Sequence, residues 1–307
     1  MKDQAATPFA ASEALHSCLP QSEILWISGS DGQRLGARFW PAHSHSPVLI
    51  YLHGIEGHSL WFARTAELLQ EKGVCVYGID RRGSGMNLDQ RGHVKSYKSW
   101  LEDVDLVLTK VRTDHPKQPL FLMANCWGAK LATIVAACDG PPGAGLSGLI
   151  LTCPAIFTKP DVGLSTRIKI AIDCIFKRAH MAIPMLIPLT TSMFTDNPIY
   201  LDYIEKDPLR LVEATPAFFF ENFWLGLLAQ KTSRRLQLPL LVVQTGCDQI
   251  VDTPALKSWF AKVQSADKTF KLFADAAHSI DFDAHHFDEY VALLLSWIGD
   301  RVGVRAP

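Results

Sequence analysis

Three features of the sequence predict an α/β protein built on a mainly parallel sheet. Short apolar segments alternate with amphipathic helical patterns along most of the chain. Most of these segments are continuously apolar, which is typical of strands covered by helices on both faces. Ser30-Asp31-Gly32 separates the first two extended segments and predicts an opening hairpin.

The predicted elements follow one another in a regular order. Strands are expected at residues 23–28, 35–40, 48–52, 74–79, 120–123, 149–152, 240–245 and 269–273. Helices are expected at residues 60–71, 97–112, 129–137 and 286–298. In the second of these helices, Trp100, Val104 and Leu108 recur on one face, as in a helix packed against a sheet.

Residues 156–236 break the alternation of strands and helices. They contain apolar helical runs, several prolines and an aromatic cluster at 218–224, with no convincing strand. We interpret them as a helical cap inserted between two core strands. The expected division is a first core part at 1–155, a cap at 156–236 and a second core part at 237–307.

Composition restricts the class of protein. The chain has 307 residues, 48% of them hydrophobic and 20% charged, and a formal net charge of −1, which gives no reason to expect a nucleic-acid partner. The seven cysteines lie far apart, without a CxxC pair or metal-ligand spacing, so we expect reduced thiols, a cytoplasmic location and neither a metal nor an organic cofactor. No signal peptide, membrane-spanning segment or stable membrane insertion is predicted.

The segment around Cys126 carries the strongest chemical signal. An apolar strand at 120–123 runs into Ala124-Asn125-Cys126-Trp127-Gly128 and then into a helix. Strand, sharp turn and helix form the setting of a Gly-x-Ser-x-Gly nucleophile elbow, here with a thiol at the nucleophile position. A helix N-terminus stabilises a thiolate, so Cys126 is the predicted nucleophile. The alternative is a small, buried cysteine that only packs in a tight turn.

Two further residues complete the chain order nucleophile, acid, histidine. Asp248 follows the strand at 240–245, and His278 follows the strand at 269–273. Both lie past the carboxyl end of a strand, where parallel sheets carry their sites. His278 is expected to move protons, and Asp248 to orient the imidazole and stabilise its charged form.

Each of these partners has an alternative interpretation. Asp248 has the sequence setting of a turn-capping aspartate. His278 competes with His285 and His286, which precede the final helix and are expected to be exposed. His53 and His58 are expected to be structural or to line a pocket.

An acyl-transfer site also needs fixed hydrogen-bond donors for the oxyanion. The N–H of Trp127, directly after the nucleophile, is one predicted donor. The second is the N–H of Ile55, in the loop after the strand at 48–52, where Gly54 allows a close backbone approach. The residues expected to bind substrate are Gly54, His53, Phe219 and Phe223.

These motifs resemble the α/β-hydrolase superfamily, and within it the monoacylglycerol lipase/lysophospholipase-like branch. The resemblance extends over roughly residues 25–297. The motifs that carry it are His53-Gly54-x-x-x-His58-Ser59, Asp80-x-x-Gly83-x-Gly85, Arg91-Gly92-x-Val94, the elbow, Asp207-Pro208-Leu209 and Gly246-x-Asp248. The resemblance implies an eight-stranded sheet, a helical cap and acyl-transfer chemistry, with the roles of nucleophile, acid, histidine and oxyanion donors falling on the residues named above.

The elbow itself departs from that branch. Members carry Gly-His-Ser-Met-Gly-Gly, whereas this chain has Ala-Asn-Cys-Trp-Gly-Ala. Cysteine at this point resembles dienelactone hydrolases and polyhydroxyalkanoate synthases, which share the fold and use a thiolate. We therefore expect a Cys-His-Asp hydrolase that acts on an ester or thioester of an apolar acyl chain, small or carrier-bound, through an acyl-thioester. Transfer of the acyl group to an amine, alcohol or thiol, and a non-catalytic ligand-binding role, are the alternatives.

Overall fold

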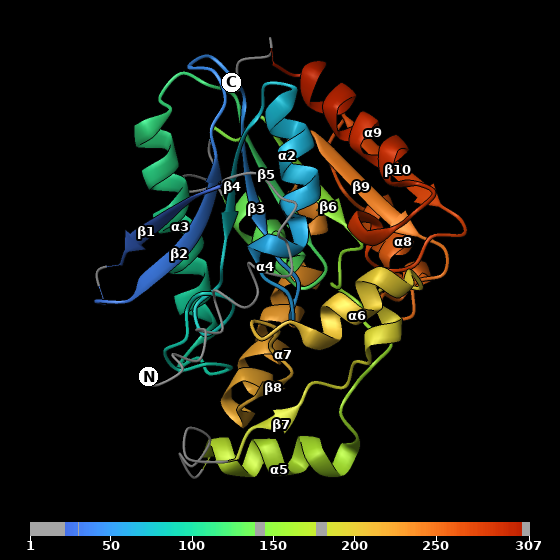
Figure 1. The fold of residues 1–307 in the computed structure, drawn as a ribbon. Helices are drawn as coiled ribbons and strands as arrows, with labels where there is room; N and C mark the ends of the chain where they lie inside the picture. The colour runs from blue at the N-terminus through green and yellow to red at the C-terminus, as the bar shows by residue number, and fades with distance from the viewer. Residues whose placement is uncertain (1–21, 30, 139–144, 176–182, 303–307) are drawn as a thin grey trace, which may run out of the picture.

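The predicted eight-stranded, mainly parallel sheet is confirmed (Figure 1). A computed structural model describes residues 22–29, 31–138, 145–175 and 183–302. The strand order is β1-β2-β4-β3-β5-β6-β9-β10, and only the pairs β1–β2 and β2–β4 are antiparallel. The bounds are β1 (Glu23–Ser28), β2 (Arg34–Trp40), β3 (Val48–Leu52), β4 (Cys75–Ile79), β5 (Leu120–Asn125), β6 (Gly148–Thr152), β9 (Leu240–Thr245) and β10 (Lys268–Phe273).

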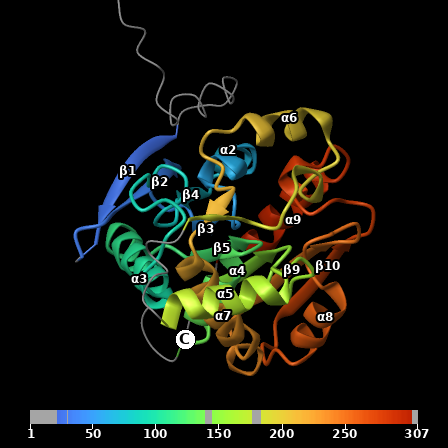
Figure 2. The same ribbon diagram turned by 90° about the horizontal axis from the view of Figure 1, so that it is seen from below.

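Helices cover both faces of the sheet, as the apolar strands require. Figure 2 shows α2 and α9 on one side and α3, α4 and α8 on the other. Strand β3 illustrates the consequence, since Val48, Ile50 and Leu52 join the core under α3 and α4, and Leu49 and Tyr51 join the core under α2 and α9. The bounds are α2 (Ala63–Glu71), α3 (Tyr97–Asp114), α4 (Gly128–Ala136), α8 (Thr253–Ala261) and α9 (Phe287–Gly299). The sequence pattern did not predict α8.

The segment between β6 and β9 is largely helical and lies beyond one end of the sheet (Figure 1). It contains α5 (Leu164–Ile175), α6 (Pro198–Lys206) and α7 (Pro216–Gln230), with α7 packed against both α4 and α5. The expectation that it holds no strand was wrong. Strands β7 (Met185–Leu186) and β8 (Glu213–Ala214) pair antiparallel, and two residues each are too few to show a period in the sequence.

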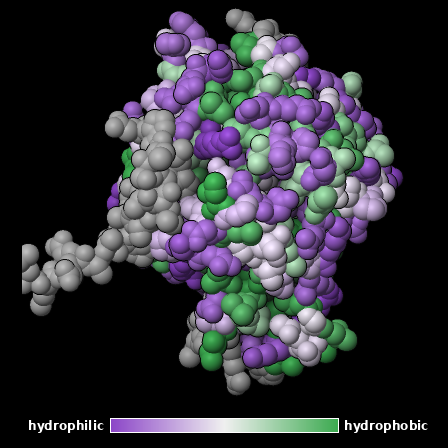
Figure 3. All heavy atoms as spheres, turned by 45° about the vertical axis from the view of Figure 1, so that its right-hand side comes forward, coloured by the Kyte–Doolittle hydropathy of each residue, from purple (hydrophilic) through white to green (hydrophobic). Residues whose placement is uncertain are grey.

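The outer face of α5 is apolar. Leu164, Ile168 and Ile172 recur every four residues and are 73%, 53% and 47% exposed. Figure 3 shows hydrophobic side chains at this end of the molecule, next to hydrophilic ones. None of the described helices combines the length and the apolar character that a membrane crossing requires.

Candidate active site

Cys126 occupies a strained turn between β5 and α4. Its φ is +51°, a left-handed conformation that costs an L-residue about 1–2 kcal/mol. Backbone hydrogen bonds hold it there, since Cys126 N–H donates to Thr152 O at 2.9 Å and Cys126 O accepts from Ala155 N–H at 2.9 Å. The side chain is therefore fixed at the carboxyl end of the sheet, beside the start of α4.

Gly128 allows the elbow to approach the neighbouring strand. A Cβ atom at this position would lie 2.6 Å from Leu52 O and 2.8 Å from His53 O, which is closer than backbone atoms tolerate. Strands β3 and β5 pair in parallel with Leu52 opposite Ala124. This register brings the loop after β3 to the side of Cys126, and a Cβ at Gly54 would contact the Cys126 Cβ at 3.2 Å.

The structure brings Asp248 and His278 together, although 30 residues separate them. His278 Nδ1 lies 2.8 Å from Asp248 Oδ2, and both side chains are buried. The carboxylate is also fixed by the N–H groups of Ile250 and Val251, which donate to Oδ1 at 2.7 and 2.9 Å. By contrast, His285 is exposed, and His286 pairs with another carboxylate outside this site.

The electrostatic setting favours a charged imidazole at His278. Burial by itself lowers the pKa of this ring, but the charges of Asp248 and Cys126 and the hydrogen bond to Asp248 outweigh burial and raise the pKa to about 10. The same pairing, against the effect of burial, lowers the pKa of Asp248. Nε2 of His278 makes no hydrogen bond of standard geometry within the described residues.

The loop after β3, which carries Gly54 and Ile55, is held by Arg81, a residue that the sequence analysis did not assign to the site. Its guanidinium donates to Ile55 O at 2.8 Å and to Gly54 O at 3.4 Å, and it stacks over the Trp127 ring at 4.4 Å. Within the described residues, the N–H groups of Ile55 and Trp127 have no hydrogen-bond acceptor. Both residues line the same cavity as Cys126.

A cavity of about 640 Å³ is lined by Cys126 and by residues of the segment between β6 and β9. Phe219 and Phe223, both predicted to bind substrate, line it together with Ile55 and Trp127. This volume is in the range of cavities that hold small ligands. Most of the remaining wall comes from apolar residues of the segment between β6 and β9, such as Ile170 and Leu189.

His53 and Gly54, the other predicted substrate contacts, do not line this large cavity. They border a cavity of about 20 Å³ that Cys126 and His278 share. His53 Nδ1 donates to Gly54 O at 2.7 Å and Nε2 accepts from Arg81 N–H at 2.9 Å. Burial and the Arg81 charge lower the pKa of His53 to about 3, so the ring is a neutral support of the loop.

His58 is structural, as the sequence suggested. Its Nε2 lies 2.6 Å from Asp207 Oδ2, and the same oxygen accepts from Trp61 Nε1 at 2.8 Å and Tyr203 Oη at 3.2 Å. Asp207 belongs to the segment between β6 and β9. The contact therefore joins that segment to the core beside the loop after β3.

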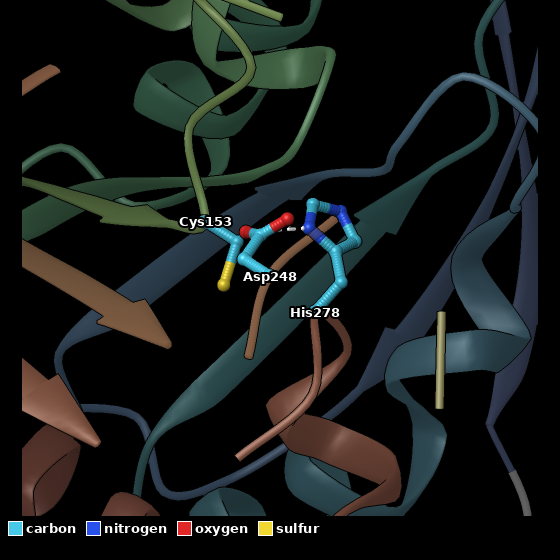
Figure 4. Close-up of side chains that lie close together, drawn as sticks. All are labelled: Cys153, Asp248 and His278. Atoms are coloured by element: carbon cyan, nitrogen blue, oxygen red, sulfur yellow. Dashed lines mark hydrogen bonds and ion pairs between the residues drawn. The ribbon is translucent and has the colours of Figure 1, made fainter. Parts of the chain in front are cut away.

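A second thiol, Cys153, lies near the acid and the histidine (Figure 4). The potential ligand atoms of Cys153, Asp248 and His278 lie within 4.8 Å of one another, and Figure 4 shows the carboxylate next to both other side chains. Burial raises the pKa of Cys153 well above its usual range. A protonated thiol and an acid–histidine pair already bonded to each other are a poor metal-binding set.

The mostly parallel sheet, its strand order and the helices that cover both of its faces define an α/β-hydrolase fold. A family model described as serine aminopeptidase, S33, matches residues 43–285, and the chain belongs to this family. Among its relatives, a monoglyceride lipase of Rattus norvegicus is 24% identical over 292 residues, or 93% of each chain. Phospholipase YtpA of Bacillus subtilis is 25% identical over 257 residues, 82% of this chain and 95% of the relative.

Solved structures agree on the architecture. A soluble variant of monoglyceride lipase from Saccharomyces cerevisiae, crystallised with a substrate analogue, superposes with a TM-score of 0.80 at 20% identity. The match covers 93% of this chain and 97% of that one. At this identity the likeness shows the fold alone.

Proposed function

We propose that this chain is an acyl hydrolase that uses Cys126 as nucleophile on an ester or thioester of an apolar acyl chain. The single observation that carries the proposal is the Asp248–His278 pair beside a thiol held in an elbow conformation. The names of the lipase and phospholipase relatives support ester hydrolysis as the reaction class. The mostly apolar cavity supports an acyl chain as its occupant.

In the proposed reaction, the Cys126 sulfur attacks the acyl carbon after giving its proton to His278. The carbonyl oxygen becomes negative and accepts hydrogen bonds from the N–H groups of Ile55 and Trp127. The bond to the leaving oxygen or sulfur then breaks, and the leaving group takes the proton from His278. A thioester of Cys126 remains as the intermediate.

Water completes the proposed cycle. His278 accepts a proton from the water as its oxygen adds to the thioester carbon. The C–S bond then breaks, the acid leaves, and the proton returns to Cys126. The raised pKa of His278 supports the imidazolium form, which stabilises a neighbouring thiolate between turnovers. Asp248 keeps the imidazole in position throughout.

The division of the chain and its location belong to the same proposal. We assign residues 156–236 to a cap and the remainder to a hydrolase core. Five cysteines are free thiols, which suits a reducing compartment such as the cytoplasm: Cys75, Cys126, Cys138, Cys153 and Cys247.

Two thiols near His278 make a matched test of the nucleophile. Wild type, Cys126→Ala and Cys153→Ala are mixed with p-nitrophenyl butyrate, and the burst of p-nitrophenolate and the acyl adduct are measured. We expect a stoichiometric burst and an adduct on Cys126 in wild type and Cys153→Ala, and neither in Cys126→Ala. A burst that survives Cys126→Ala, or one that disappears only in Cys153→Ala, contradicts the assignment. Transfer of the acyl group to an added amine faster than to water would favour an acyltransferase.

A further inference from the structure

Lys130 places a buried ammonium group in the wall of the substrate cavity. It lies in the first turn of α4, four residues after Cys126, and is 6% exposed. Its Nζ donates to Asn222 Oδ1 at 2.7 Å. Within the described part of the chain, no carboxylate pairs with it.

The oxygen that accepts from this ammonium is shared with a second donor. Asn222 Oδ1 also accepts from Trp127 Nε1 at 2.7 Å, so two donors already occupy this oxygen. The indole can only donate, and the ammonium has three N–H groups, of which one is used. Among the described residues, one of the three N–H groups therefore has a hydrogen-bond acceptor, and the other two are available to a ligand.

A cation in this position is unfavourable without an anion. The positive end of the α4 dipole opposes it, and removal from water opposes it further. Burial lowers the pKa of Lys130 to about 8, although the Cys126 charge acts in the opposite direction, so most of the population is still charged at about pH 7.

A purely structural role explains this arrangement poorly. The Trp127–Asn222 hydrogen bond already joins α4 to α7 without a charge. The acidic side chains in the cavity wall are engaged elsewhere, because Asp161 pairs with Arg167 and Asp252 Oδ1 caps α8 through Ala255 N–H. Apart from the Cys126 thiolate, whose charge raises the pKa of Lys130, an anionic ligand is the partner that the described cavity wall leaves for the ammonium.

We propose that Lys130, positioned by Asn222, binds a carboxylate on the acyl part of the substrate. The natural acyl donor is then a monoester or thioester of a dicarboxylic acid, with one carboxyl group free. The carboxylate site does not depend on the proposed acyl-transfer function. The inference rests on that function only in making the other end of the ligand an ester or thioester. Lys130 and Cys126 line the same cavity, so one ligand can contact both the ammonium and the thiol.

Binding to a protein without its nucleophile separates this inference from catalysis. Cys126→Ala is titrated by calorimetry with monomethyl adipate, which carries one carboxylate, and with dimethyl adipate, which carries none. We expect the monoester to bind at least about tenfold more tightly, and Lys130→Met in the same background to abolish the difference. Lys206→Met removes an exposed ammonium of α6 and should leave the difference unchanged. Equal affinities, an unchanged preference in Lys130→Met, or no measurable binding of either ester would overturn the inference.

The same titrations at several pH values distinguish anion binding from a packing role of Lys130, because a packing role predicts no pH dependence of the preference for the monoester. The preference for the monoester should decline as pH rises through about 8, where Lys130 loses its proton. If Lys130→Met fails to fold, Lys130→Gln keeps a donor for Asn222, removes the charge and should show the same loss of preference. A failure of wild type to form an acyl adduct would count against the proposed hydrolase, whereas a lack of preference between the two esters counts only against the anion site.

Discussion

Replacing Asp248 by asparagine tests how the acid controls His278. The carboxylate receives four hydrogen bonds, two from the backbone at Oδ1 and two at Oδ2, from His278 Nδ1 and from Gln244 Nε2 at 2.9 Å. An asparagine has only one acceptor oxygen. If that oxygen keeps the backbone donors, the amide N–H groups face Gln244 and His278.

The consequence for the imidazole follows from this donor arrangement. His278 Nδ1 must become an acceptor for the introduced side-chain amide, so the proton moves to Nε2, the atom that has to receive the thiol proton. An acid-to-amide change of this kind slows triad enzymes by roughly 10³–10⁴. The opposite rotamer leaves two buried N–H groups without an acceptor, which costs about 1–3 kcal/mol of folding stability.

The pH dependence has a definite sign. The pKa of His278 is raised from 6.5 to about 10, so the stabilisation from its pairing is fully present below pH 6.5 and is lost as pH rises through about 10. Asp248→Asn removes the charge that raises this pKa. Between pH 6.5 and about pH 10, the difference in unfolding free energy between wild type and variant should therefore be largest at pH 6.5 and should decrease as pH rises.

Stopped-flow measurement of the p-nitrophenyl butyrate burst gives the acylation rate, and urea unfolding across the same pH range gives stability. Asp275→Asn is the matched control, because Asp275 bonds to His286 at 2.7 Å on the surface, away from Cys126. The control should acylate within about twofold of wild type. If Asp248→Asn acylates within about threefold of wild type, the assigned role of Asp248 is wrong.

Two further substitutions test the backbone around Cys126, one in the turn before α4 and one beside the loop after β3. Gly128→Ala puts a Cβ 2.6 Å from Leu52 O, so we expect a loss of roughly 1–3 kcal/mol in urea unfolding, and wild-type stability would show that the elbow has more room than described. Arg81→Lys removes the planar group that contacts Gly54 O, Ile55 O and the Trp127 ring. We expect acylation to slow by about tenfold or more with little change in KM, and an effect confined to KM would argue against a role at the oxyanion loop.

The sequence was most informative where local chemistry fixes the structure. Continuous apolar segments identified the core strands, and the turn between residues 124 and 128 identified the elbow, because a strand, a small-residue turn and a helix are all properties of neighbouring residues. The same reasoning missed α8 and the strands β7 and β8. The last two are each two residues long, and only their partner strand defines them.

Some residues of the candidate site could be predicted from the sequence, and others could be recognised only in the structure. The order Cys126, Asp248, His278 and the position of each after a strand can be read along the chain, since parallel strands carry their carboxyl ends to one edge. The positions of Arg81, Lys130 and Asn222 cannot, because their roles come from contacts across 26 to 92 residues of sequence.

By itself, the sequence determined the layered fold and the candidate chemical groups, because hydrophobic period and turn chemistry act over a few residues. Only the tertiary structure decided which histidine meets the acid, which amides remain free beside the thiol, and that a lysine is buried in the cavity wall without a carboxylate partner among the described residues. Those outcomes depend on burial and on long-range pairing, and neither is a property of a local segment.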